Sequence, residues 1–175
     1  MVDHVGEKKV NQVVESGKGV PDPPGFELPL LLFGAFRTLI DRLHARLAEE
    51  GYADLRPAHG FALQAIGPDG STASDIGRRL GVSKQAAGKT VDRLTALGYA
   101  ERTDDAQDAR RKLVRLTGRG RGALIRSAAV FGELRAEWVA ALGAQRVRDI
   151  EGDLRGIVPA DTAFRLDATS WLGGI

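Results

Sequence analysis

Small and cationic side chains gather at the start of one predicted helix, in the stretch VSKQAAGKTVDRLTALGY at residues 82–99. Lys84, Gln85, Gly88 and Lys89 fall on the side opposite the apolar residues. Lysine can bond guanine O6 and N7 or a phosphate, and glutamine can bond two atoms of adenine. Gly88 costs about 1 kcal/mol of helix stability relative to alanine, but it lets the helix axis approach the bases closely. The pattern favours contacts to DNA base edges, or packing of this face against a neighbouring helix.

The element that must position these side chains is a helix with a clear start and stop. Ser83 is its predicted N-cap, and the free N–H groups at this end would point at phosphate. Gly98 supplies the left-handed stop. The stripe expected to face the core consists of Ala86, Thr90 or Val91, Leu94 and Leu97.

A β-hairpin with a cationic tip is predicted to follow. Tyr99 and Ala100 lead one short strand, residues 104–111 form a polar tip, and residues 113–116 return as the second strand. The cations Arg110, Arg111 and Lys112 could enter the adjacent minor groove, where narrow A·T tracts attract arginine. A plain surface charge is the alternative for each of them.

Carboxylates accompany the cations of this tip. Asp108 lies two residues before Arg110 and is expected to fix the direction of its guanidinium. It could instead pair with Arg93 or Arg102 at the end of the preceding helix. Asp108 would support the hairpin in both arrangements, and Arg93 would do so in the second.

Two shorter helices are predicted upstream. One begins at Pro57, which suits the first helical position, and ends before GPDG at 67–70. The other is capped by Thr72, with Asp75 in its first turn, and closes at Gly81. The segment TASDIGRRLGVS therefore has the outline of a helix-turn-helix.

Long amphipathic helices flank this region. Apolar residues recur every three or four positions from Leu32 to Leu47, which predicts a helix over about 28–50. Two more helices are predicted over about 118–142 and 144–157, although the glycine-rich opening GRGRG argues against a regular first turn. The expected apolar side of the first of these consists of Ala128, Phe131, Leu134, Trp138 and Leu142. Both apolar faces could form a core or a contact with a second copy.

Charge is unevenly divided along the chain. Thr72 to Arg121 contains 12 Lys and Arg and 6 Asp and Glu, a net charge of +6, so the other residues carry −4 of the overall +2. A local basic segment is typical of a phosphate-binding face, because neutralised phosphates release counterions. A solvated run of charge is the alternative.

Composition excludes several classes of protein. The 175 residues, 43% hydrophobic, suffice for one medium domain with a core. With no apolar run of the roughly 18 residues needed for a membrane span, and no secretory signal, we expect a cytoplasmic protein. The absence of cysteine, with histidines only at 4, 44 and 59, argues against a metal site. No phosphate loop or nucleophile elbow is present, so neither an enzyme nor a cofactor is predicted.

Together these residues resemble the multiple antibiotic resistance regulator (MarR) family of winged-helix transcription factors. The matching pattern is TASDIGRRLGVSKQAAGKTVDRLTALGYAERTDDAQDARRKLVRLTGRG, about 50 residues. Its most specific part is LGYAER, then D-A-R at 108–110, then LVRLT at 113–117. Gly77 and Gly88 depart from the family, which usually carries alanine at the first position and seldom glycine at the second.

The resemblance implies a mainly α fold. A winged helix-turn-helix lobe of three helices and a β-hairpin wing, about 55–117, would lie between dimerisation helices at about 28–50 and 118–157. This domain would span 27–158, after a disordered arm at 1–26 and before a tail at 159–175. The N-terminal and C-terminal helices of two chains would interlock in a homodimer.

The resemblance also implies binding to a palindromic site in double-stranded DNA, and a repressor by family habit. The 83–97 helix would lie in the major groove and the 104–112 wing in the minor groove, with Arg110 at its tip and Asp108 as its companion. One lobe covers half of a typical site, which independently favours a two-fold dimer.

Many relatives bind small aromatic or phenolic anions between the dimer helices and the lobe. Candidates for such a crevice are His44, Arg46, Arg56, His59 and Trp138. Two alternatives stay open: a DNA-binding regulator with no effector, and a winged-helix interaction module that does not bind DNA.

Overall fold

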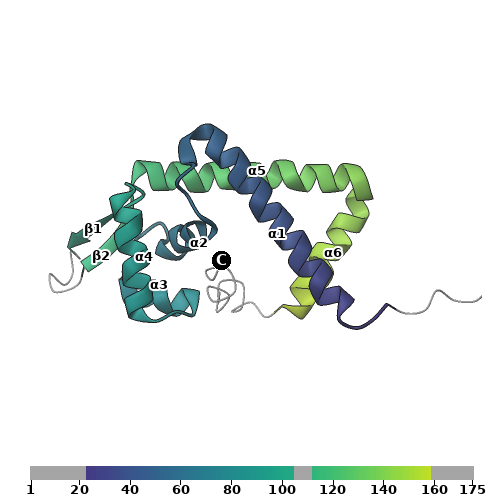
Figure 1. The fold of residues 1–175 in the computed structure, drawn as a ribbon, viewed down its shortest axis with the longest axis horizontal. Coiled ribbons are helices and arrows are strands. Elements are labelled where there is room, and N and C mark those ends of the chain that lie inside the picture. The colour runs from purple at the N-terminus through teal and green to yellow at the C-terminus, as the bar shows by residue number, and fades with distance from the viewer. Residues whose placement is uncertain (1–22, 105–111, 159–175) are drawn as a thin grey trace, which may run out of the picture.

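A triangle of three long helices stands beside a smaller lobe of helices and a hairpin (Figure 1). The computed structural model describes residues 23–104 and 112–158. The triangle consists of α1 (Glu27–Leu47), α5 (Gly118–Leu142) and α6 (Ala144–Ile157). The lobe consists of α2 (Pro57–Ile66), α3 (Ala73–Leu80), α4 (Lys84–Ala96), β1 (Ala100–Asp104) and β2 (Lys112–Leu116). This confirms the predicted mainly α fold with a winged helix-turn-helix.

The helix-turn-helix is built by two side-chain caps and one glycine. Thr72 Oγ1 accepts a hydrogen bond from Asp75 N, and Ser83 Oγ accepts one from Ala86 N, both at 3.2 Å. Gly81 adopts φ +70° and ends α3, as predicted. Gly77 is explained by the tight turn, because a Cβ there would lie 3.0 Å from Val82 O.

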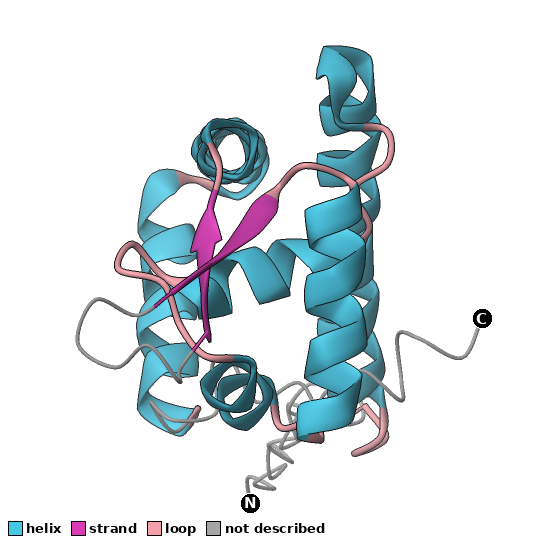
Figure 2. Ribbon diagram, turned by 90° about the vertical axis from the view of Figure 1, so that its left-hand side faces the viewer, coloured by secondary structure: helices cyan, strands magenta, loops and turns pink. Residues whose placement is uncertain are grey.

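The wing is a two-stranded antiparallel ribbon attached to the lobe (Figure 2). Ala100 pairs with Leu116 at its base and Asp104 with Lys112 toward its tip. Ser71 forms a further bridge to Val114, with backbone hydrogen bonds of 2.9 and 2.8 Å in the two directions. This bridge fixes the ribbon to the segment just before α3.

One apolar core joins the triangle to the lobe. Its fully buried large side chains are Tyr99, Leu47, Leu63, Ile66, Ile76, Leu94, Leu134, Val91, Val114 and Val130. They come from α1, α2, α3, α4, α5 and the wing, so the lobe and the triangle pack together through one core.

The predicted stripe of α4 was wrong at one position. Val91 and Leu94 are buried, but Ala86 is exposed and Ala87 is the buried alanine. Positions 87, 91 and 94 follow the i, i+4, i+7 spacing of one helix face, and Ala87 fills the space beside the glycine of α3. The exposed face of α4 therefore includes residue 86.

Two expectations for α5 were also wrong. Its first turn is regular despite the glycines, because Thr117 caps it by accepting a hydrogen bond from Gly120 N at 3.1 Å. Of the predicted apolar side, Leu134 is buried but Ala128 and Leu142 are exposed. The buried side consists of Gly120, Ala123, Ser127, Val130 and Leu134, because α5 packs on the lobe and α1 along this stripe.

The helix predicted over 28–50 is confirmed as α1, which ends in a π-helical turn, η1 (Ala48–Tyr52). Gly51 has φ +89° there, a left-handed conformation that suits glycine. Only the C-terminal half of α1 joins the core, through Ile40, Leu43 and Leu47. Among the described residues, none of the helices has the length and apolarity required to cross a membrane.

Candidate nucleic-acid interface

The N-terminal half of α4 presents its polar face to solvent. Ser83, Lys84, Gln85 and Lys89 are all exposed. A Cβ added at Gly88 would meet nothing within 4 Å, so this face is flat and open at its middle. The predicted side chains therefore share one accessible surface, which we call the α4 face (Ser83, Lys84, Gln85, Gly88 and Lys89).

The charge of the α4 face is uncompensated within the described residues. Neither Lys84 nor Lys89 forms an ion pair there, and the first turn of α4 contains no acidic residue. The N-terminus of a helix adds partial positive charge of its own. An anion is thus the natural partner for this surface.

The wing places further cations beside the α4 face. Arg102 Nη2 donates to Asp92 Oδ1 at 2.7 Å, which ties β1 to α4. Lys112 pairs with Asp104 across the ribbon. Lys84, Arg102 and Lys112 line one polar cleft of about 460 Å³, together with the first turn of α3. Sequence reasoning assigned Arg102 only as a possible partner of Asp108, and the alternation of charge in β1 gave no sign of its contact with Asp92.

Of the other residues predicted to contact DNA through the wing or to support it, the structure describes only Arg93. Asp108, Arg110 and Arg111 lie outside the described residues. Arg93 is exposed and has no carboxylate partner within the described part of the chain. It lies near His59, whose pKa its charge helps to lower.

The five predicted effector-binding residues do not line one cavity. His44 is half-buried in a cleft of about 30 Å³ between α1, α2 and α5, and Trp138 lines a different, apolar cavity of about 230 Å³ between α1, α5 and α6. Arg56 is exposed at the N-cap of α2. His59 is buried, and its Nδ1 accepts a hydrogen bond from Arg56 N at 3.2 Å. Only His44 therefore faces the cleft between the triangle and the lobe.

Burial shifts the titration of both histidines. The pKa of His44 is lowered by desolvation, which a backbone hydrogen bond with Leu55 partly opposes. The pKa of His59 is lowered by desolvation and by the charges of Arg56 and Arg93. Both imidazoles are thus held in the neutral form at neutral pH.

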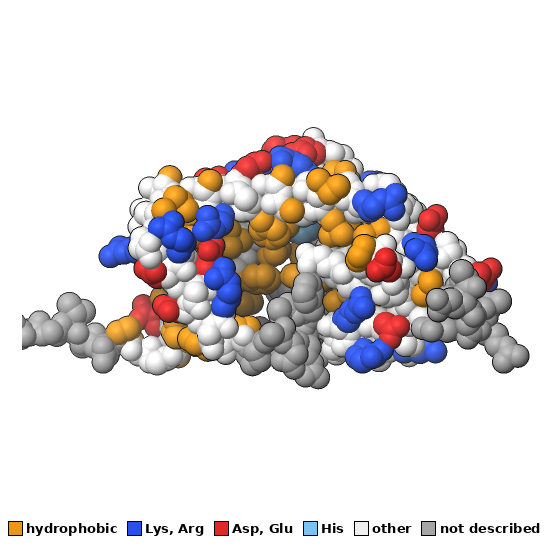
Figure 3. Space-filling view, turned by 180° about the vertical axis from the view of Figure 1, so that it is seen from behind, with side chains coloured by type: hydrophobic (Ala, Val, Ile, Leu, Met, Phe, Trp, Pro, Cys, Tyr) orange, Lys and Arg blue, Asp and Glu red, His pale blue; other side chains and the backbone are white. Residues whose placement is uncertain are grey.

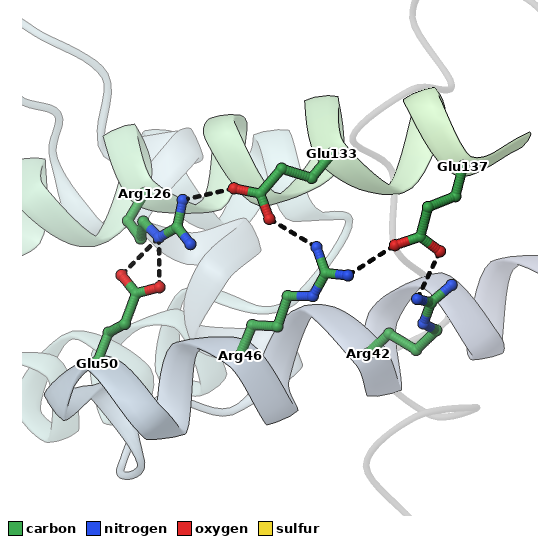
Figure 4. Close-up of polar contacts among 6 residues, drawn as sticks. All are labelled: Arg42, Arg46, Glu50, Arg126, Glu133 and Glu137. Atoms are coloured by element: carbon green, nitrogen blue, oxygen red, sulfur yellow. Dashed lines mark hydrogen bonds and ion pairs between the residues drawn. The ribbon is translucent and has the colours of Figure 1, made fainter. Parts of the chain in front are cut away.

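Arg46 belongs to an ion-pair ladder between α1 and α5 (Figure 4). Its two terminal nitrogens bond Glu133 Oε2 at 2.6 Å and Glu137 Oε1 at 2.7 Å. The ladder, in spatial order, consists of Glu50, Arg126, Glu133, Arg46, Glu137 and Arg42. Arg46 is consequently engaged by two carboxylates, and an anionic effector would have to displace them.

Apolar side chains surround the space between the triangle and the lobe. Figure 3 shows a hollow there, lined by hydrophobic side chains with a histidine among them. Phe36 of α1 and Phe61 of α2 stack across this space with ring centroids 6.5 Å apart. Over residues 23–104 and 112–158, the structure contains no group of three His, Asp or Glu side chains that could hold a metal ion.

A capped helix-turn-helix followed by a two-stranded ribbon defines a winged-helix protein. Residues 53–111 match the sequence model of the MarR family. The winged-helix part of the chain is therefore similar to the MarR family, whose members are DNA-binding transcription regulators.

Solved structures show the same similarity. The reduced form of MarR from E. coli is 26% identical, with 75% of this chain and 96% of that chain covered and a TM-score of 0.64. A mutant of E. coli MarR, complexed with operator DNA, is 25% identical over 76% of this chain and 94% of that one, with a TM-score of 0.61. An S. aureus MepR mutant bound to an oligodeoxyribonucleotide shares the fold at 21% identity, covering 74% and 94%, with a TM-score of 0.54. A search of curated proteins gave no significant match.

Proposed function

We propose that this chain is a dimeric transcription regulator, and by family habit a repressor, that binds a palindromic DNA site. The α4 face enters the major groove, and the wing lies along the minor groove. Lys84 and Lys89 contact guanine or phosphate, and Gln85 contacts an adenine. Arg110, Arg111 and Lys112 supply the wing contacts.

The observation that carries this proposal is the α4 face itself. Its cations are exposed and lack carboxylate partners within the described residues, while Ala87, Val91 and Leu94 hold the opposite face in the core. A recognition helix needs this combination, because base edges must be reached by free side chains on a rigid support. The E. coli relative in complex with operator DNA supports the same assignment by analogy.

Exposed apolar residues of the triangle support the dimer. Phe26, Leu28, Leu30 and Leu31 are each more than 60% exposed, and Ile157 on α6 is 77% exposed. Exposed apolar side chains in this number are typical of a protein–protein interface. A second copy that covered α1 and α6 would place two α4 faces on one side of the dimer, in successive major grooves.

An effector is proposed for the cleft that His44 lines. At about 30 Å³ the cleft has room for about one water molecule, so an aromatic or phenolic anion requires it to widen. Because the cleft lies between α1, α2 and α5, widening would shift the lobe against the triangle. A ligand that binds only the widened form would therefore alter the separation of the lobes.

The proposal is tested by selecting duplexes from a random pool and measuring affinity against salt concentration. We expect a palindromic consensus and a steep linear decline of log K with log salt. Arg110→Ala should weaken binding to all duplexes and reduce that slope by about one unit. Failure to bind any duplex at low salt would instead favour a protein-interaction module. Repeating the selection with benzoate or a phenol tests the effector.

A further inference from the structure

One arginine at the start of α5 holds the C-terminal end of α4. Arg119 Nη1 donates to the carbonyl of Leu97, the C-cap residue of α4, at 2.9 Å. Its Nη2 donates to Gly51 O at 3.3 Å and to the two carboxylate oxygens of Asp54 at 3.0 and 3.2 Å. The guanidinium carbon lies 4.4 Å from the ring centroid of Tyr99. A single side chain therefore joins the end of α4 to the connection between α1 and α2.

The partners of Arg119 are themselves held in place by further contacts. Tyr99 is fully buried, and its hydroxyl donates to Asp54 Oδ1 at 2.6 Å. This hydrogen bond and the charge of Arg119 lower the pKa of Asp54, so the carboxylate is charged at neutral pH. Thr117 Oγ1 donates to Gly98 O at 2.6 Å, a second link from α5 to the residues that end α4.

Close backbone packing fixes the same junction. A Cβ on Gly120 would lie 2.1 Å from Tyr99 O, so the first turn of α5 touches the base of β1 without an intervening side chain. The junction is thus held both by hydrogen bonds and by close backbone contact. Rotation of the lobe about the start of α5 would have to break the contacts of Arg119.

We propose that Arg119 is a positioning residue, which sets the direction of α4 relative to the triangle and hence the separation of the two α4 faces in the dimer. The inference rests on the proposed function, because that separation matters only if two α4 faces bind one duplex. A guanidinium suits this task, since its planar fork of donors serves a helix-end carbonyl and a carboxylate together. A lysine ammonium has one nitrogen and could hold only one of the two well.

The direct test measures the distance between the two α4 helices in the free dimer. The chain has no cysteine, so Ala86→Cys, at the exposed end of α4 farthest from Arg119, gives a single site for a nitroxide label. Pulsed electron paramagnetic resonance should show one narrow distance distribution in the otherwise unaltered chain. Arg119→Ala should broaden it or shift its maximum, and Arg119→Lys should do so to a smaller extent.

Arg121→Ala is the matched control. Arg121 carries the same charge in the same turn of α5. Its guanidinium, however, donates to the carbonyl oxygen of Leu116, the last residue of β2, at 2.6 Å. Its removal should leave the distance distribution unchanged. A folded Arg119→Ala chain with an unchanged distribution would overturn the inference. If Arg119→Ala does not fold, an unchanged distance distribution in Arg119→Lys would overturn the inference instead.

A second measurement uses the selected palindrome with one base pair inserted between its half-sites. The insertion displaces one half-site by about 3.4 Å and about a tenth of a turn. We expect the unaltered chain and Arg121→Ala to lose roughly tenfold or more in affinity, and Arg119→Ala to lose clearly less, because its lobes can adjust. Equal losses in all three would overturn the inference while leaving the proposed function intact. Absence of duplex binding and of any interprotomer distance in the unaltered chain would overturn both.

Discussion

The cations of α4 and the cations between α1 and α5 differ in what they face. Lys84 and Lys89 are exposed and have no carboxylate partner within the described residues. Arg46, by contrast, is held by two glutamates in the ladder. A phosphate could bind Lys84 at once, whereas at the ladder it would have to displace a charged partner already in place. Within the described residues, pairing with carboxylates, more than the number of cations, therefore distinguishes the ladder from the α4 face.

The largest expected effect comes from removing the two lysine charges of the α4 face. Lys84→Gln with Lys89→Gln should weaken binding to the selected duplex by about 2–6 kcal/mol in total. The slope of log K against log salt should fall by about 0.9 for each phosphate that the variant no longer neutralises. The measurement is fluorescence anisotropy over a series of salt concentrations.

The matched variant removes two paired cations from the triangle. Arg42 bonds Glu137 at 2.6 Å, and Arg135 bonds Glu151 at 2.6 Å. Arg42→Gln with Arg135→Gln should leave the salt slope unchanged. Equal reductions of the slope in both double variants would show that pairing does not locate the interface.

Local signals in the sequence predicted the lobe well. Thr72, Ser83 and Gly81 are caps and stops whose chemistry acts over three or four residues, and the structure places all three where the sequence indicated. The register of α4 was predicted less well, because Ala86 and Ala87 are adjacent and equally apolar. Only the packing of α4 against the glycine of α3 decides which alanine is buried.

Contacts between distant segments could not be predicted in this way. Arg46 and Glu133 are 87 residues apart, and neither has a periodicity that points to the other. Arg46 was therefore predicted as an effector ligand, whereas it lies in the ladder. Arg119 likewise gave no local sign of its bond to Leu97, since that bond depends on how α5 crosses the end of α4.

A smaller effect should separate the individual roles within the α4 face. Gln85→Ala should relax the preference at one base pair by about 1–3 kcal/mol, because the bidentate bond to adenine is removed there. Binding to duplexes that already lack this adenine should hardly change. Competition among duplexes with all four bases at each position measures this. Uniform losses at every position would contradict a base-reading role for Gln85.

The two histidines and the ion-pair ladder should lose their contributions to stability at different pH values. The pKa values of His44 and His59 are lowered from 6.5, so the unfolded chain takes up these protons first. Their contribution to stability is present above pH 6.5 and is lost as pH falls below it, by at most about 1.4 kcal/mol per pH unit for each histidine. The pKa values of Glu133 and Glu137 are lowered from 4.5, so the ladder weakens only in more acidic solution.

Urea unfolding between about pH 7 and pH 5.5 measures the histidine window. The free energy of unfolding should decline over this range, and the combined variant His44→Gln and His59→Gln should have a flatter profile. An equally steep decline in the variant would show that other groups titrate there.

The smallest expected effect is that of breaking the ladder at its centre. Arg46→Met leaves Glu133 with Arg126 and Glu137 with Arg42, so neither glutamate loses every partner. The Tm should therefore fall only slightly, because the network lies at the surface and water already screens it. High salt should remove even this difference, since the screening length at 1 M is about 3 Å. Lys89→Met, which breaks no ion pair within the described residues, should leave the Tm unchanged at every salt concentration. If Lys89→Met lowered the Tm as much as Arg46→Met in low salt, the contrast between paired and free cations would no longer hold.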